Sequence, residues 1–167
     1  IKHGYKELTI KPKHNDFQID PNALHIWPRK NMMVIALPND DKSFTCTLFM
    51  KKNGINSFNS IKTKKDIFSF FEKNFTDLIH LIPNIDEYFI NNPIGNLISL
   101  DVNNWIYKEK ACLIGDAAHA IVPFYGQGMN ASFEDCSIIS EILDEKNSWD
   151  SVFNTYYNRR KKDADAI

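Results

Sequence analysis

The sequence contains little of what several large protein classes depend on. It has only six glycines in 167 residues, and no G-x-G-x-x-G occurs among them, so the loop that holds a dinucleotide pyrophosphate at a βαβ unit is absent. Its three cysteines, Cys46, Cys112 and Cys136, are far apart and lack C-x-x-C spacing. This pattern argues against a disulfide framework or a zinc finger and favours reduced thiols.

Long hydrophobic runs and an excess of one charge are also missing. No run approaches the roughly 18 apolar residues of a membrane span, and the first residues contain no apolar signal-peptide region. The 20 basic and 21 acidic residues nearly cancel, which disfavours nucleic acid as a partner. The chain starts at Ile1 rather than Met and ends without a helix stop signal, so we expect an internal piece of a longer protein.

What is present is a composition with 43% hydrophobic residues, enough for a real core. In the N-terminal half, short apolar runs separated by turn residues predict an antiparallel meander with strands near 5–10, 24–27, 32–37 and 43–50. Period two places Met33, Ile35 and Leu37 on one face of their strand. The next strand presents Thr45, Thr47 and Phe49 together. Taken by themselves, such faces indicate a core.

A helix is predicted after the meander. Apolar residues recur at spacings of three and four behind Thr63, a candidate N-cap, and ahead of Pro83. They are Ile67, Phe71, Phe75, Leu78 and Ile82. The pattern indicates one amphipathic helix whose phenylalanines serve packing. A further strand is expected within 97–102.

The stretch 111–130, ACLIGDAAHAIVPFYGQGMN, indicates a ligand site. It predicts a strand over 111–114, then Gly-Asp, a tight loop and the start of a helix. Asp116 at a strand end could accept hydrogen bonds from a polyol, as ligands of open α/β sheets lie there. Gly126 and Gly128 would let the backbone approach a flat ligand. The plain alternative is that Gly-Asp only makes a turn.

His119 follows Asp116 by three residues and could be imagined as a metal partner. With no third ligand in view, a hydrogen-bonded structural histidine is favoured. The helix after the loop is predicted from apolar residues at helical spacing, with Glu134 and Asp135 in its first turn. The apolar residues are Met129, Phe133, Cys136, Ile139 and Leu143. A last helix is expected from about Asp150 to the end.

The combination is more specific than its parts. GDAAHAIVPFYGQGMNASFEDC is similar to the second FAD motif of class A aromatic hydroxylases and resembles the kynurenine 3-monooxygenase family in particular. LHIWPRKNMMVIALPNDDKSFTCTLFM resembles that family's substrate-domain sheet. The resemblance, loosest over 51–110, implies a mixed α/β fold of the glutathione-reductase-like type. Residues 1–104 would belong to the antiparallel substrate sheet and 105–167 to a partial, Rossmann-like FAD-binding domain.

The resemblance also assigns roles to residues of the loop. Asp116 would hydrogen-bond the ribityl chain of FAD, while the backbones of Met129 and Asn130 would meet the pyrimidine edge of the flavin. A helix N-terminus there would stabilise the negative charge of reduced flavin. The remaining implied flavin-binding residues are Pro123, Gln127 and Gly128.

A substrate pocket is implied beside the flavin. Ile35, Leu37 and Phe49 resemble its apolar wall, and Phe124 would flank it together with Pro123. Tyr125 stands where relatives often carry a second phenylalanine, so its hydroxyl could alter the pocket. No side chain of the segment is expected to act as acid, base, nucleophile or metal ligand, because the cofactor supplies the hard chemistry.

The implied activity is an FAD-dependent hydroxylation of L-kynurenine to 3-hydroxykynurenine in tryptophan degradation, with NADPH as electron donor and O2 as oxidant. The alternatives are a related hydroxylase with another aromatic acid as substrate and a non-catalytic flavin-fold module. Because the pyrophosphate motif is absent, weak FAD binding by the chain alone is expected. A bacterial protein would be cytoplasmic, whereas eukaryotic relatives are held at the outer mitochondrial membrane by a C-terminal segment.

Overall fold

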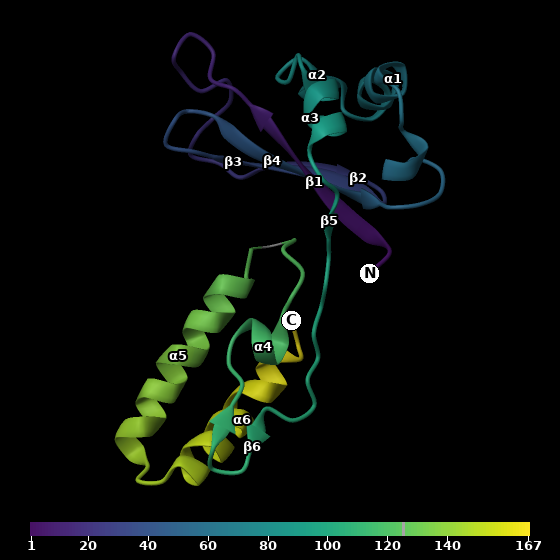
Figure 1. Ribbon diagram of the computed structural model, residues 1–167. Coiled ribbons are helices and arrows are strands. Elements are labelled where there is room, and N and C mark those ends of the chain that lie inside the picture. The colour runs from purple at the N-terminus through teal and green to yellow at the C-terminus, as the bar shows by residue number, and fades with distance from the viewer. Residues whose placement is uncertain (125) are drawn as a thin grey trace. The chain divides into compact units, whose positions relative to one another are not determined.

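The chain folds as two compact units, Ile1–Asn96 and Leu97–Ile167. The computed structural model describes residues 1–124 and 126–167 (Figure 1). Tyr125, which the sequence suggested as a change in the pocket, lies outside the described residues. Strands and helices occur in both units, as expected for the mixed α/β class.

The first unit is built on an antiparallel sheet of five strands in the order β2-β3-β4-β1-β5. All four predicted strands are present, and their ends differ from the predicted ends by one or two residues. Pro28 lies in an edge strand, where a missing backbone N–H is tolerated. The strands are β1 (His3–Ile10), β2 (His25–Arg29), β3 (Met32–Pro38), β4 (Phe44–Lys51) and β5 (Gly95–Asn96).

Helices α1 (Lys64–Asn74), α2 (Thr76–Ile79) and α3 (Ile85–Asn91) pack on one face of this sheet (Figure 1). A short 3-10 turn, Phe58–Ser60, precedes them. The predicted cap is confirmed, because the Thr63 side chain accepts a hydrogen bond from the Asp66 N–H in a capping box.

The single helix predicted over Ile67–Ile82 is wrong, since the chain breaks at Phe75, where φ is −140° and ψ is 51°. The Asn74 amide donates to the Phe70 carbonyl at 2.8 Å, and the Thr76 hydroxyl donates to the Glu72 carbonyl at 2.6 Å. Such side-chain bonds compete with the helical ladder and end α1. All five apolar residues of the predicted stripe are nonetheless buried.

The core of the first unit lies between the helices and one face of the sheet. Val34 and Ala36 of β3 point into it and are fully buried. The opposite face carries the two predicted sets, because Met33 pairs with Phe49, Ile35 with Thr47 and Leu37 with Thr45. The predicted sharing of faces is confirmed, but that face lies away from the helix-covered core.

The second unit combines a short β-ribbon with three helices. β6 (Ile106–Tyr107) pairs antiparallel with β7 (Ala111–Cys112). The strand predicted over 111–114 is therefore shorter than expected, because Leu113 and Ile114 pass beyond the ribbon and are partly exposed. Within the described residues, 97–102 contains no strand, so that prediction is wrong. The helices are α4 (Asp116–His119), α5 (Gly128–Glu145) and α6 (Trp149–Ala164).

Both predicted long helices of the second unit are present, but the packed face of α5 differs from the predicted one. Met129 and Phe133, of the expected apolar stripe, are 67% and 62% exposed, while Ala131, Asp135 and Ile142 are buried. Because α5 begins at Gly128, Asp135 lies beyond the first turn, in which no acidic residue occurs. An ion pair from Asp135 to α6 selects the packed face.

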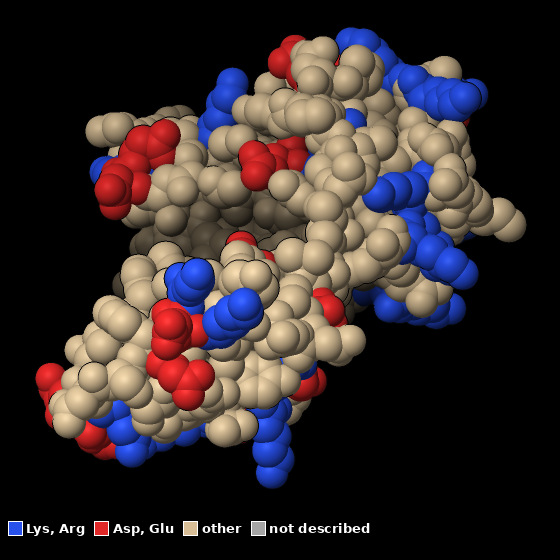
Figure 2. Space-filling view, turned by 60° about the horizontal axis from the view of Figure 1, so that its bottom comes forward, with Lys and Arg blue, Asp and Glu red and all other residues tan. Residues whose placement is uncertain are grey.

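Charge is spread over the surface. Figure 2 shows basic and acidic side chains on the same face of the molecule, consistent with a net charge of −1. No helix in the described part of the chain is long and apolar enough to cross a membrane.

Candidate functional site

The Gly115–Gly128 loop brings several predicted residues together in the second unit. α4 begins at Asp116, whose side chain is exposed, and α5 begins at Gly128. A side chain added to Gly128 would meet the Asp116 Oδ1 atom at 3.9 Å, so the carboxylate lies beside the start of α5. Gly126 has a φ of 65°, which favours glycine, and a Cβ there would face open space among the described residues.

The first turn of α5 is exposed and lacks an acidic residue. Met129 and Asn130 are both exposed in it, and the Asn130 amide donates to the Gln127 Oε1 atom at 3.2 Å. The free N–H groups at the start of an 18-residue helix favour a partly negative acceptor. An acceptor-rich planar group could therefore be held by this turn, and a polyol by the neighbouring Asp116.

The predicted pocket residues fall in both units. Ile35 and Phe49 of the first unit are 9% and 3% exposed, although they lie on the sheet face away from the helices, and Leu37 is 47% exposed. The ring of Phe49 lies 6.2 Å from that of Tyr5. Phe124 is half-buried in the second unit, and Pro123 is exposed there.

Three buried polar side chains meet in the second unit, and the sequence did not predict that they come together. Asp135, Arg160 and His119 are 0%, 1% and 5% exposed. The Arg160 Nε atom donates to Asp135 Oδ1 at 2.7 Å, and the His119 Nε2 atom lies 2.6 Å from Asp135 Oδ2. We call these three residues the buried ionic cluster.

The structure confirms that His119 is a hydrogen-bonded structural histidine. No group of three metal-ligating side chains occurs among the described residues. The burial of Asp135 and Arg160 was not predicted, because lone charges in amphipathic helices usually face solvent. The spacing of Asp135 with Ala131, Ile138 and Ile142 could have marked it as inward-facing.

Burial and the contacts of the cluster shift the pKa values of Asp135 and of the neighbouring Tyr156. Burial would raise the pKa of Asp135, but hydrogen bonds from Arg160, Gly115 and His119 outweigh it and lower that pKa. Burial, followed by the nearby Asp135 charge, raises the pKa of Tyr156. Asp135 is therefore a carboxylate at neutral pH, and Tyr156 is a neutral phenol.

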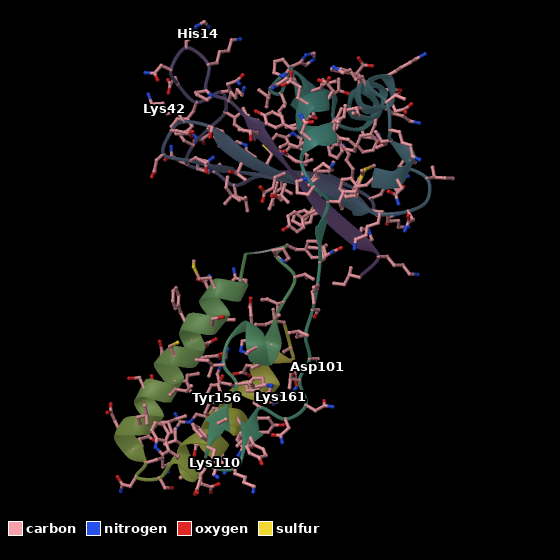
Figure 3. All side chains as sticks on the ribbon, viewed as in Figure 1. His14, Lys42, Asp101, Lys110, Tyr156 and Lys161 are labelled. Atoms are coloured by element: carbon pink, nitrogen blue, oxygen red, sulfur yellow. The ribbon has the colours of Figure 1, made fainter. Side chains whose placement is uncertain are left out.

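A further ion pair ties the start of this unit to α6. The Lys161 Nζ atom lies 3.1 Å from Asp101 Oδ1, and both residues are labelled in Figure 3 together with Tyr156 of the same helix. This pair is exposed at its acidic end, so it stabilises the unit little. The buried ionic cluster, in contrast, is almost fully shielded from solvent.

One comparison with known proteins matches the second of the two units of the chain, and others match the chain as a whole. The family model described as an FAD binding domain matches residues 100–167, within the second unit. A kynurenine 3-monooxygenase from Flavobacterium psychrophilum is 50% identical over 100% of this chain and 38% of its own length. Those from Cytophaga hutchinsonii and Dictyostelium discoideum are 48% and 44% identical, and the chain covers 37% and 39% of them.

Solved structures share the fold. Pseudomonas aeruginosa PqsL, in complex with 2-aminobenzoylacetate, has a TM-score of 0.76 and 13% identity, covering 100% of this chain and 46% of its own. The 2-methyl-3-hydroxypyridine-5-carboxylic acid oxygenase has a TM-score of 0.72 and 17% identity, covering 99% and 44%. The chain is thus similar over its whole length to kynurenine 3-monooxygenases, and it spans less than two fifths of the length of those compared above.

The loop residues fit one end of FAD. The exposed Asp116 carboxylate suits a ribityl hydroxyl, and the exposed first turn of α5 suits the polar edge of the flavin. Apart from its chain neighbours, no described residue has an atom within 4 Å of a Cβ built on Gly126, so the backbone there is open to a ligand. A glycine-rich loop for the pyrophosphate has no counterpart in the sequence.

Proposed function

We propose that the protein containing this chain is an FAD-dependent monooxygenase that converts L-kynurenine to 3-hydroxykynurenine with NADPH and O2. The observation that carries this proposal is identity of 48–50% with kynurenine 3-monooxygenases along 100% of the chain. The match includes both the flavin loop and the sheet, so it is not limited to a shared cofactor motif. Flavin motifs are common to hydroxylases of many aromatic acids, so the flavin loop alone does not indicate the substrate. The match over the sheet is what supports kynurenine.

We assign the second unit to FAD binding. Asp116 would accept hydrogen bonds from the ribityl hydroxyls, and the backbone N–H groups of Met129 and Asn130, both exposed residues, would face the pyrimidine edge of the flavin. The positive end of α5 stabilises negative charge at that edge. The residues proposed to complete the contact surface are Pro123, Gln127 and Gly128.

We assign the first unit to the substrate. Ile35, Leu37 and Phe49 share a sheet face that lies away from the helix-covered core, which supports a role as pocket wall. In the second unit, Phe124 of the loop is proposed separately as a substrate contact, next to Pro123. An apolar wall of this kind orients an aromatic ring and excludes water from it.

The bound FAD, once reduced by NADPH, would supply the activation of O2. The chain's own groups bind, orient and shield, and none of them needs to transfer a proton. A bacterial form is proposed to work in the cytoplasm, whereas a eukaryotic form would be held at the outer mitochondrial membrane by a further segment.

The test is an assay of the complete flavoprotein. NADPH oxidation and formation of 3-hydroxykynurenine should rise together when L-kynurenine is added, and they should not do so with benzoates or hydroxypyridine acids. Hydroxylation of another aromatic acid in preference to kynurenine would identify a related hydroxylase instead. A purified protein without FAD and without NADPH oxidation would support a non-catalytic module.

A further inference from the structure

In the buried ionic cluster, one carboxylate makes more connections than the packing of α5 against α6 alone would require. Asp135 of α5 is bonded to α6 through Arg160, to α4 through His119, and to the turn before α4 through the Gly115 N–H, which donates to Asp135 Oδ2 at 2.8 Å. Arg160 is also engaged elsewhere, since it reaches Glu134 Oε2 at 2.9 Å and the Ala131 carbonyl at 3.4 Å. A single carboxylate thus joins three helices and one turn.

Gly115 is the point at which this carboxylate meets the candidate flavin loop. Its φ of 59° and ψ of −143° belong to a region that only glycine adopts readily. A Cβ there would approach the Ser132 Oγ atom to 3.0 Å. Its carbonyl accepts from the N–H groups of Ala118 and His119 at 2.8 and 3.0 Å, so its orientation sets that of α4, which begins with Asp116.

Stability alone is a weak reason for such a cluster. The cost of removing charges from water largely offsets their attraction, and well-packed apolar side chains can stabilise a core as well. What a buried and fully hydrogen-bonded carboxylate contributes is one defined geometry. In this unit, the carboxylate fixes the geometry of the turn at Gly115, which leads into Asp116.

We propose that Asp135 is a positioning residue for flavin binding, which acts by holding Gly115 and His119 so that Asp116 is presented to the ribityl chain. The inference rests on the proposed function, because it requires that Asp116 binds FAD. Asp135 itself is fully buried, so it would not touch a cofactor bound at the surface of the loop. We assign its effect to Asp116, because the hydrogen bond from the Gly115 N–H to Asp135 fixes the turn that leads into Asp116.

A double-mutant cycle on the complete flavoprotein tests this. FAD is titrated into the apoprotein of wild type, Asp135→Asn, Asp116→Ala and the double variant. Each single substitution should weaken FAD binding by about tenfold or more, and the double variant should be no more than about twofold weaker than the worse single variant. Losses that multiply, or an unchanged affinity of Asp135→Asn, would overturn the inference.

Two further variants separate positioning from general damage. Asp144→Asn, an exposed carboxylate on the same helix, should bind FAD like wild type. His119→Phe keeps a ring against Trp105 but removes one bond to Asp135, so it keeps the test possible if Asp135→Asn does not fold. It should also weaken FAD binding without a further loss in the Asp116→Ala background, and full multiplicative loss there would contradict positioning.

The outcomes distinguish the inference from the function on which it rests. A wild-type protein that binds no FAD would overturn both. A wild type that binds FAD and hydroxylates kynurenine, with Asp135→Asn equally tight, would overturn only the positioning role. Amide hydrogen exchange gives a readout independent of activity, because the Gly115 N–H should lose protection in Asp135→Asn while α5 and α6 remain protected.

Discussion

Asp116 is the single residue on which the proposed cofactor contact depends most directly. In the complete flavoprotein, Asp116→Ala should weaken FAD binding by roughly ten- to a hundredfold, because the ribityl hydroxyls lose a charged acceptor. The measurement is FAD content of the purified protein beside its thermal melt by circular dichroism. Lower FAD content with an unchanged apoprotein melt is expected. An unchanged FAD content would refute the assignment.

Phe49 and Phe71 form a matched pair, since both are buried. Phe49 lies on the sheet face away from the helices, whereas Phe71 of α1 packs in the core against the other face. Phe49→Ala should raise the KM for kynurenine and the fraction of NADPH consumed as released H2O2, because a loosened pocket admits water. Phe71→Ala should instead cost roughly 3–5 kcal/mol of stability and leave that fraction nearly unchanged. If both variants lose stability alike and neither changes peroxide release, Phe49 is a core residue and the pocket assignment is wrong.

Asp135 should make the second unit sensitive to acid. Its pKa is lowered in the folded state, so its contribution is present above the unfolded value of about 3.9 and is lost as pH falls through the lower folded value. Wild type should therefore lose stability below about pH 4, whereas Asp135→Asn, less stable at pH 7, should lose less on acidification. Urea unfolding followed by circular dichroism between pH 7 and 3 checks this, and parallel curves would contradict it.

At the scale of elements, the start of α1 is stabilised by the capping box between Thr63 and Asp66. Thr63→Ala should destabilise the first unit by about 1 kcal/mol, because the Asp66 N–H loses its side-chain acceptor. Thr63→Ser retains the hydroxyl and should restore most of the loss. The free energy of unfolding from urea titration is the measurement. Equal stability of the alanine variant and wild type would show that the cap contributes nothing.

The helices show which structural features a sequence pattern can predict and which it cannot. The N-cap at Thr63 was predictable from the sequence because its hydrogen-bond partner, the Asp66 N–H, is only three residues away. The break at Phe75 was not, because Asn74 and Thr76 bond carbonyls of the preceding turn while the apolar spacing continues unbroken. On α5, a stripe through Met129 and Phe133 and one through Ala131 and Asp135 both follow helical spacing. Only the partner helix decides which stripe is packed.

At the scale of the whole molecule, the two units carry complementary parts of the proposed enzyme, and the pyrophosphate loop is absent from both. The chain alone should therefore bind FAD weakly or not at all, because the contacts that would offset the loss of ligand freedom are too few. Titration of the purified chain should give no tight quenching of flavin fluorescence. Submicromolar binding would show that the loop and the first turn of α5 suffice.

Some features followed from the sequence because they are local. Alternation along a strand assigns Ile35 and Leu37 to one face by covalent geometry, and the Gly-Asp loop before α5 was recognisable from adjacent residues. Tertiary structure decided the rest. It determined that this sheet face is the one turned away from α1–α3 and that β7 pairs with β6. It also brought Asp135 to Arg160, since a buried ion pair between residues 25 positions apart depends on how two helices pack, and no local pattern encodes that.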